Sequence, residues 1–294
     1  MGSPERVSRE KDSLVIPGLN PIRYEMRSAL FYGTVWAIKR LGRLALGFHG
    51  FVLREFAGGI ECWFHLPRDI DTSQPPIVFF PGIGFGPMQY LDHLRQVQER
   101  HPNRPIFVLS SSHTALSAAA EIATEFHVLA AVDCLMAEHR FDKFSLIGHS
   151  FGTLLAALVA NCRPSSITHF TLIDPICFMF WEASLLYTSQ FATPDSSLQY
   201  VAVRFITKDP LFAAAYARLM YFPCNGLLPE NIPCPADIYL SNKDWAIDPQ
   251  RVQSYLLHRK EVSQLETFNV HMFDVAHQEY MLVPEAYNHI NNVI

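Results

Sequence analysis

The sequence lacks the features that mark disulfide-stapled, glycosylated or metal-bound domains. Its six cysteines form no C-x-x-C pair and have no disulfide-like spacing, no N-x-Ser/Thr sequon occurs, and no cluster of metal ligands or dinucleotide-binding glycine fingerprint is present. These absences favour a reducing, cytoplasmic location. They also lead us to expect neither a metal ion nor another cofactor.

Charge is also scarce. Only 17% of the 294 residues are charged, the net charge is −5, and the basic residues are dispersed along the chain. We expect no nucleic-acid partner, because proteins that bind nucleic acids gather basic residues on one face. The hydrophobic share of 49% is enough for a sizeable core, in one large domain or two small ones.

No stretch predicts a membrane span. Residues 144–162 are uncharged over a span-like length. They contain a glycine-bounded serine turn, however, so they are interpreted as a strand followed by a buried helix. Residues 29–38 are apolar but too short to cross a bilayer, and basic residues follow them.

The most informative motif that is present is GHSFG at residues 148–152, which fits the pattern G-x-S-x-G. An apolar run at 144–147 precedes it and an Ala/Leu-rich stretch at 153–160 follows it. This context predicts a strand, a sharp turn and a helix, with Ser150 at the apex. The two glycines let strand and helix pass closely. The backbone N–H of Phe151 then lies at a helix N-terminus, where it can face a developing oxyanion.

Short apolar runs alternate with helix-forming stretches along the rest of the chain. The runs at 51–56 and 60–66, joined around Gly58-Gly59, predict a β-hairpin. Further strands are expected at 77–80, 106–109, 144–147, 169–173, 238–240 and 267–272, and helices at 88–100 and 116–140. Strands that alternate with helices predict an α/β fold with a mostly parallel sheet covered on both faces.

Some sixty apolar, aromatic-rich residues separate the strands that end at Ile173 and begin near Asp237. This length predicts a helical cap inserted at 175–233, between core segments 51–174 and 234–294. A pair of ordinary crossover helices is the alternative. We expect Phe178 and Trp181 of the cap to line a substrate pocket. Three basic residues of the cap are expected on its solvated outer face: Arg204, Lys208 and Arg218.

Residues 1–50 form an N-terminal extension, and its part at 21–48 has helical periodicity. Apolar residues recur there at helical spacing, namely Leu30, Ala37, Leu41, Leu44 and Phe48. One interpretation is a helix on a membrane surface, which would make the protein peripheral to a membrane. The other is an arm that packs on the domain. We expect the packed arm, because the interleaved basic residues do not form one clean face.

A serine hydroxyl needs a base within hydrogen-bond reach, and such groups gather at the carboxyl ends of parallel strands. His277 follows the last predicted strand, on a loop before a C-terminal helix, where it could reach Ser150. His271 is the rival base, but it lies inside the strand, where a structural role is expected. The sequence therefore favours His277.

The base in turn needs an acid that holds its ring and stabilises its charge. Asp244 follows the strand that ends near Leu240, and the chain order Ser…Asp…His favours it. Asp248 precedes a proline and is expected to cap the next helix. Asp174, at the end of an earlier strand, is the alternative as a displaced acid.

The loop Pro81-Gly82-Ile83-Gly84 leaves the first central strand and can supply a second oxyanion donor. The N–H of Ile83 is the expected donor, with Gly84 next. A glycine-rich strand exit without a ligand is the alternative. His149, beside the serine, is expected either to line the pocket or to fill the turn.

Together, PGIG after a strand, GHSFG, a cap, SNKD and AHQEY in this order resemble the serine hydrolases of the α/β-hydrolase fold. The resemblance covers residues 52–294 and implies an eight-strand-type sheet with a triad of Ser150, His277 and Asp244. Many members of the family carry His-Gly where this chain has Pro81-Gly82. That departure should change pocket polarity without removing a backbone donor.

The resemblance, with serine at the turn, argues against epoxide hydrolases and haloalkane dehalogenases of this fold, which need a carboxylate nucleophile. We expect hydrolysis of a carboxylic ester through an acyl-Ser150 intermediate. The aromatic cap predicts an apolar small-molecule or lipid-like substrate. Acyl transfer or thioester hydrolysis by the same residues is one alternative, and a ligand-binding receptor with little turnover is another.

Overall fold

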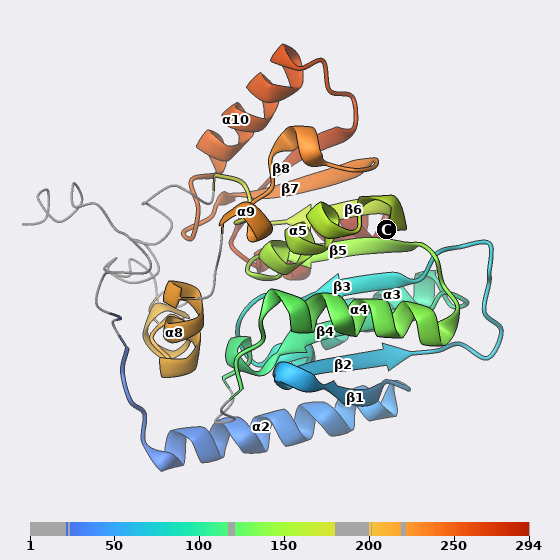
Figure 1. Ribbon diagram of the computed structural model, residues 1–294. Helices are drawn as coiled ribbons and strands as arrows, with labels where there is room; N and C mark the ends of the chain where they lie inside the picture. Colours follow the sequence, from blue (N-terminus) through green and yellow to red (C-terminus); the bar gives the residue numbers. More distant parts are fainter. Residues whose placement is uncertain are drawn as a thin grey trace, which may run out of the picture.

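An eight-stranded sheet runs through the centre of the protein (Figure 1). The computed structural model describes residues 22, 24–116, 121–179, 200, 202–218 and 222–293. The strands are β1 (Val52–Phe56), β2 (Ile60–His65), β3 (Ile77–Phe80), β4 (Ile106–Ser111), β5 (Phe144–His149), β6 (Ile167–Ile173), β7 (Ala236–Lys243) and β8 (Phe268–Ala276). Their order across the sheet is β1-β2-β4-β3-β5-β6-β7-β8.

Strand β2 pairs antiparallel with both of its neighbours, and every pair from β4 to β8 is parallel. The predicted hairpin and mostly parallel sheet are confirmed. The hairpin turn at Ala57–Gly59 has left-handed backbone at Gly58 (φ 73°) and Gly59 (φ 67°), which glycine adopts at little cost. The parallel strands all end at one edge of the sheet, and this edge positions the site.

Helices cover both faces of the sheet. The α-helices are α2 (Ala29–Phe48), α3 (Leu91–Arg100), α4 (Glu125–His139), α5 (Gly152–Cys162), α8 (Pro210–Arg218), α9 (Phe222–Asn225), α10 (Pro249–Val262) and α11 (Pro284–Val293). Short 3-10 turns include η2 (Gly86–Tyr90), η3 (Ser112–Thr114), η6 (Pro229–Asn231) and η7 (Glu279–Leu282), and η5 (Ala202–Thr207) is π-helical.

Two hydrophobic cores hold the layers together. One lies between the sheet and α4, α5 and α10, with Leu135, Leu158 and Leu256 buried in it. The other lies against α3 and α11, where Leu94 and Ile290 are buried. Complete burial of one such side chain contributes about 1.5–3 kcal/mol. Because both sheet faces are covered, the parallel strands are nearly continuous runs of apolar residues.

Helix α4 is shorter than the sequence predicted. The expected start at Leu116 is wrong, because that residue has left-handed backbone (φ 46°) and 121–124 are not helical. The helix begins after Thr124, which forms a capping box with His127. It ends at Arg140, whose φ is 59°.

The segment between β6 and β7 is described in part. Helix α8 stands apart from the sheet at the carboxyl ends of the strands, and α9 packs on α5 (Figure 1). Residues 180–199, with Trp181 among them, lie outside the described residues, so the extent of the predicted cap stays a prediction. Arg204 and Lys208 do not only face solvent: both lie close to the carboxylate of Glu25, 2.9 and 3.8 Å away.

Candidate active site

Ser150 lies at the turn between β5 and α5, as the GHSFG motif predicts. Its backbone is left-handed, with φ 50°, which is strained for a residue with a side chain. Any Cβ at Gly152 would overlap the carbonyl of Phe80 on β3, so only glycine fits there. The N–H of Ser150 donates to the carbonyl of Ile173 at 2.9 Å and fixes the turn to β6.

Three side chains from three strand ends meet at this turn. The hydroxyl oxygen of Ser150 lies 2.8 Å from Nε2 of His277, which follows β8. Nδ1 of the same ring lies 2.7 Å from the carboxylate of Asp244, which follows β7. All three side chains are buried. The structure therefore brings together the serine, the histidine and the aspartate that the sequence favours.

The two rival residues have other contacts. His271 lies within β8, donates through Nε2 to the carboxylate of Asp237 at 2.8 Å, and stacks on Tyr239. Asp248 caps α10 by accepting the N–H of Arg251 at 3.0 Å. Neither side chain reaches the serine.

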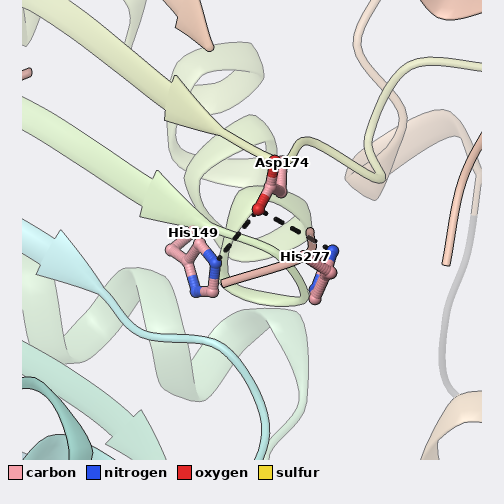
Figure 2. Close-up of side chains that lie close together, drawn as sticks. All are labelled: His149, Asp174 and His277. Carbon is pink, nitrogen blue, oxygen red and sulfur yellow. Dashed lines mark ion pairs between the residues drawn. The ribbon is translucent and has the colours of Figure 1, made fainter. Parts of the chain in front are cut away.

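Asp174 is a second buried carboxylate beside the histidine (Figure 2). It accepts the backbone N–H of Ser241 at 3.0 Å and the backbone N–H of Gln278 at 3.0 Å. Its Oδ2 lies 3.8 Å from Nδ1 of His277 and 3.7 Å from Nε2 of His149. Asp174 is thus not the direct partner of the histidine ring, since the Asp244 oxygen is more than 1 Å closer. Instead it joins the end of β7, which precedes the acid, to the turn that follows the base.

The pKa values of His277 and Asp244 depend on their burial and on the charges of Asp244 and Asp174. Burial alone lowers the pKa of His277, but the charge of Asp244, its hydrogen bond and the charge of Asp174 outweigh burial and raise the pKa to about 9. Burial raises the pKa of Asp244. Burial also opposes ionisation of Asp174, yet hydrogen bonds and the nearby histidines lower its pKa to about 2. We take the proton of the pair to reside on the ring, because two carboxylates face it.

A polar relay connects this cluster to the loop after β3. The hydroxyl of Tyr90 accepts the N–H of Gly82 at 2.8 Å and lies 2.6 Å from Nδ1 of His149. The carboxylate of Asp174 lies 3.7 Å from Nε2 of His149 and favours a proton on that nitrogen, so Nδ1 accepts the O–H of Tyr90. The proton of neutral His149 then resides on Nε2, which faces Asp174. Burial is the main cause that lowers the pKa of His149 and keeps it neutral.

Two backbone N–H groups are available near the serine. Ile83 and Phe151 both line the cavity, and neither N–H has a hydrogen-bond partner among the described residues. Gly84 is different: its N–H donates to the carbonyl of Thr114 at 2.9 Å. The expectation that Gly84 could serve as a further donor is therefore wrong, because η3 occupies that group.

His149, Asp174 and His277 place possible metal-ligating atoms within 4.8 Å of one another. His277 uses Nδ1 for Asp244 and Nε2 for Ser150, so neither nitrogen is left for an ion. Nδ1 of His149 faces Tyr90. Hydrogen bonds and charge account for this grouping.

A cavity of about 670 Å³, open mouth included, lies over Ser150. Its described lining is Gly82, Ile83, His149, Ser150, Phe151, Ile176, Ile206, Thr207, Phe212, Tyr216, Trp245, Ala246, His277 and Gln278. His149 lines it, whereas Phe178 is buried in the core and is not part of that lining. None of the described lining residues carries a Lys, Arg, Asp or Glu side chain.

Comparison with known proteins agrees with this architecture. A family model for the alpha/beta hydrolase fold matches residues 99–219. A putative lipase from Acinetobacter baumannii AYE superposes with a TM-score of 0.59 over 91% of this chain and 95% of its own, at 12% identity. The chain is an α/β-hydrolase-fold protein. A search of curated protein sequences found no match to it.

Two other solved structures share this fold. A bacterial membrane phospholipase A has a TM-score of 0.58 at 15% identity, covering 90% of this chain and 92% of its own. A carboxylesterase structure from Nitrososphaera gargenis also has a TM-score of 0.58, at 13% identity, covering 82% and 97%. The family match includes Ser150 but ends before Asp244 and His277, so the placement of those two side chains rests on the geometry above.

Sequence reasoning missed several residues around the serine. Ile206, Thr207 and Trp245 line the cavity without belonging to any motif. The ring of Trp245 packs edge-on against His277, with centroids 5.5 Å apart. Only its position one residue after Asp244 could have drawn attention to it.

Proposed function

We propose that this protein hydrolyses a carboxylic ester through an acyl-Ser150 intermediate. The observation that carries the proposal is the continuous hydrogen-bond path from Ser150 through His277 to Asp244, at 2.8 and 2.7 Å, which opens into an apolar cavity. A serine hydroxyl becomes a nucleophile when such a base takes its proton. The activity is a hydrolase reaction of the kind that the fold commonly supports.

The proposed reaction has two steps. The Ser150 oxygen attacks the ester carbonyl carbon while its proton passes to Nε2 of His277. The N–H groups of Ile83 and Phe151 would stabilise the oxyanion that forms. The carbon–oxygen bond to the leaving group then breaks, and His277 returns the proton to the departing alkoxide. Water attacks the acyl-serine in the same way and releases the carboxylic acid.

The carboxylates act through the histidine. Asp244 would hold the ring in the tautomer whose Nε2 accepts the serine proton, and would stabilise the imidazolium that results. Asp174 would add a second negative charge on the side of Nδ1. Because the site is buried, these charges act with little screening by water.

The cavity lining supports an apolar acyl or alcohol group. Ile176, Ile206, Phe212 and Tyr216 supply hydrocarbon and aromatic surface. A mostly apolar lining with a few polar groups is typical of small-molecule sites. The similar structures described above are those of a putative lipase, a carboxylesterase and a phospholipase A. They are in keeping with an ester substrate, although identity of 12–15% limits that likeness to the fold.

Two measurements test the proposal. A fluorophosphonate probe should label wild-type protein and not Ser150→Ala, and p-nitrophenyl esters of increasing acyl length should be hydrolysed by the wild type. The variant should lose about 10⁴-fold or more in kcat. Its melting temperature should match that of the wild type.

Three outcomes would contradict the proposal. A folded Ser150→Ala that keeps its turnover would reject the nucleophile. A folded wild type that neither reacts nor turns over would indicate a receptor. Turnover that requires an added alcohol and releases no acid to water would identify an acyltransferase.

A further inference from the structure

The outward face of α2 is apolar and exposed to solvent. Four of its side chains, Leu30, Leu41, Leu44 and Phe48, are 80%, 68%, 62% and 90% exposed. Their successive spacings of eleven, three and four residues place them in a single stripe along the helix. Eight of the fifteen large exposed hydrophobic side chains in the described part of the chain lie between Tyr24 and Val52. A concentration of this kind marks an interaction surface.

The opposite face of α2 is fixed against the domain, so the stripe cannot turn inward. Val35, Gly42 and Leu46 are buried. A Cβ at Gly42 would lie only 2.6 Å from Met88 of η2, so glycine allows the close approach. Leu46 belongs to the second hydrophobic core. One face of α2 therefore packs on the domain, as the sequence predicts, and the opposite face is exposed to solvent.

Charge on α2 distinguishes the kind of partner. The helix carries Lys39, Arg40 and Arg43 and no acidic residue, although the whole chain has a net charge of −5. Lys39 donates to the carbonyl of Ala115 and Arg43 pairs with Glu61, so these two hold the helix in place. Arg40 is different, because it lies on the exposed face.

The guanidinium of Arg40 lies 5.5 Å from the centre of the Trp36 ring, and Trp36 is 63% exposed. A tryptophan beside a cation at the border of an apolar stripe is typical of helices at the membrane interface. Of the described helices, none has the length and apolar character needed to cross a bilayer. A helix with this surface would lie in the plane of the interface.

We propose that the exposed face of α2 docks the protein onto an anionic phospholipid membrane. The stripe would enter the boundary between headgroups and acyl chains, and Arg40 would face lipid phosphates. A second copy of the chain fits less well, because two such faces would bring like charges together.

The start of α2 also contacts the segment that lines the cavity. Phe31 stacks on Phe205 of η5 at 5.6 Å, and the hydroxyl of Tyr32 donates to Asp209 at 3.0 Å. Ile206 and Thr207, the next residues of that segment, line the cavity. Docking through α2 would therefore hold the cavity wall close to the membrane. If the proposed function is correct, on which this step rests, the substrate is an ester dissolved in the membrane.

The experiment compares full-length variants in vesicle co-sedimentation, with phosphatidylcholine vesicles that contain or lack phosphatidylserine. L41E/L44E places charge in the stripe, and Arg40→Glu reverses the exposed charge. The matched control, L257E/V262E, changes two exposed apolar residues of α10, on the other side of the molecule (Figure 1). Hydrolysis of a short soluble ester and the melting temperature are measured for every variant.

We expect the wild type and the control to bind the anionic vesicles. L41E/L44E should bind at least about tenfold more weakly, because charged side chains do not enter the hydrocarbon boundary. Arg40→Glu should weaken binding to anionic vesicles while leaving the weaker binding to neutral vesicles nearly unchanged. Hydrolysis of the soluble ester should stay within about twofold of the wild type throughout, since none of these residues lines the cavity.

Three results would overturn the docking proposal: a wild type that does not bind vesicles, variants that bind as well as the wild type, or a wild-type dimer that L41E/L44E converts to monomer in analytical ultracentrifugation. The last result would assign the stripe to a second copy. Binding of Ser150→Ala to vesicles separates the two proposals. If it binds but wild-type protein hydrolyses no ester, the proposed function fails while membrane docking stands.

Discussion

Asp174 accepts the backbone N–H of Gln278, the residue that directly follows His277, at 3.0 Å. Its other oxygen accepts the N–H of Ser241, three residues before Asp244. One buried carboxylate directly after β6 therefore holds both the end of β7 and the turn after β8. The proposed acid and base owe their separation of 2.7 Å in part to a residue that contacts neither one by a direct hydrogen bond.

The first prediction concerns this residue. Asp174→Asn should lower kcat by about tenfold to a hundredfold, because one buried N–H loses its acceptor and the loops shift. It should also lower the pKa of the acidic limb of kcat/KM, since a negative charge near His277 is removed. KM should change little. A loss of activity without a shift of that limb would mean that the role of Asp174 is structural alone.

Replacing Asp244, the direct hydrogen-bond partner of His277, should lower activity more than replacing Asp174. Asp244→Asn should lower kcat by up to about 10⁴-fold, because an amide cannot hold the same tautomer or stabilise the imidazolium. Asp248→Asn is the matched control, since it caps α10 and should cost at most a few tenths to 1 kcal/mol of stability. Steady-state kinetics of both variants decide the matter. If Asp248→Asn or Asp174→Asn lowers kcat more than Asp244→Asn does, the role of the acid belongs to that residue instead.

The pH dependence should reveal the histidine. Turnover requires neutral His277, whose pKa is raised to about 9. The kcat/KM should therefore rise with pH over a limb well above the ordinary histidine value of about 6.5. Measurements from about pH 5 to 10 with a non-ionising ester give this limb. A limb at the ordinary value would show that the two carboxylates do not raise the pKa of the ring in the free enzyme.

The cavity wall should determine acyl-chain preference. Phe212 stacks on Tyr216 and contacts Phe151 edge-on. Each methylene that the cavity buries contributes about 0.8 kcal/mol, or roughly fourfold in kcat/KM. The wild type should therefore prefer longer chains up to a limit, and Phe212→Ala should move that limit to longer chains. Leu257→Ala, on the exposed side of α10, should leave the profile unchanged. A flat profile in the wild type would argue for a small polar substrate.

Much of the fold follows from local patterns in the sequence. An apolar run marks the strand before Ser150, and an Ala/Leu-rich stretch marks the helix after it. The glycines between them indicate a tight turn in which strand and helix pass closely. The hairpin at Gly58 and Gly59 is equally local. Chain order and the ends of the strands point to Asp244 and His277, and in the structure His277 contacts Ser150 while Asp244 contacts His277. Their catalytic roles stay a prediction.

The features that the sequence did not reveal depend on contacts between distant segments. The two bonds of Asp174 are to backbone N–H groups, which leave no trace in side-chain patterns. The contacts of Arg204 and Lys208 with Glu25 join residues 179 and 183 positions apart, so the sequence alone predicts a solvated face. Gly84 failed as a donor because η3 happens to supply the carbonyl of Thr114.

Among the described strands, β8 lies at the edge of the sheet and pairs only with β7. His277 follows this strand, whereas Ser150 is held in the interior between β5 and α5. Local opening at the margin of a sheet costs less free energy than global unfolding. Mild heating or low denaturant should therefore detach His277 while most of the chain stays folded. Inactivation should precede the loss of far-ultraviolet circular dichroism, and the activity should return on cooling before any refolding phase of the whole chain is seen.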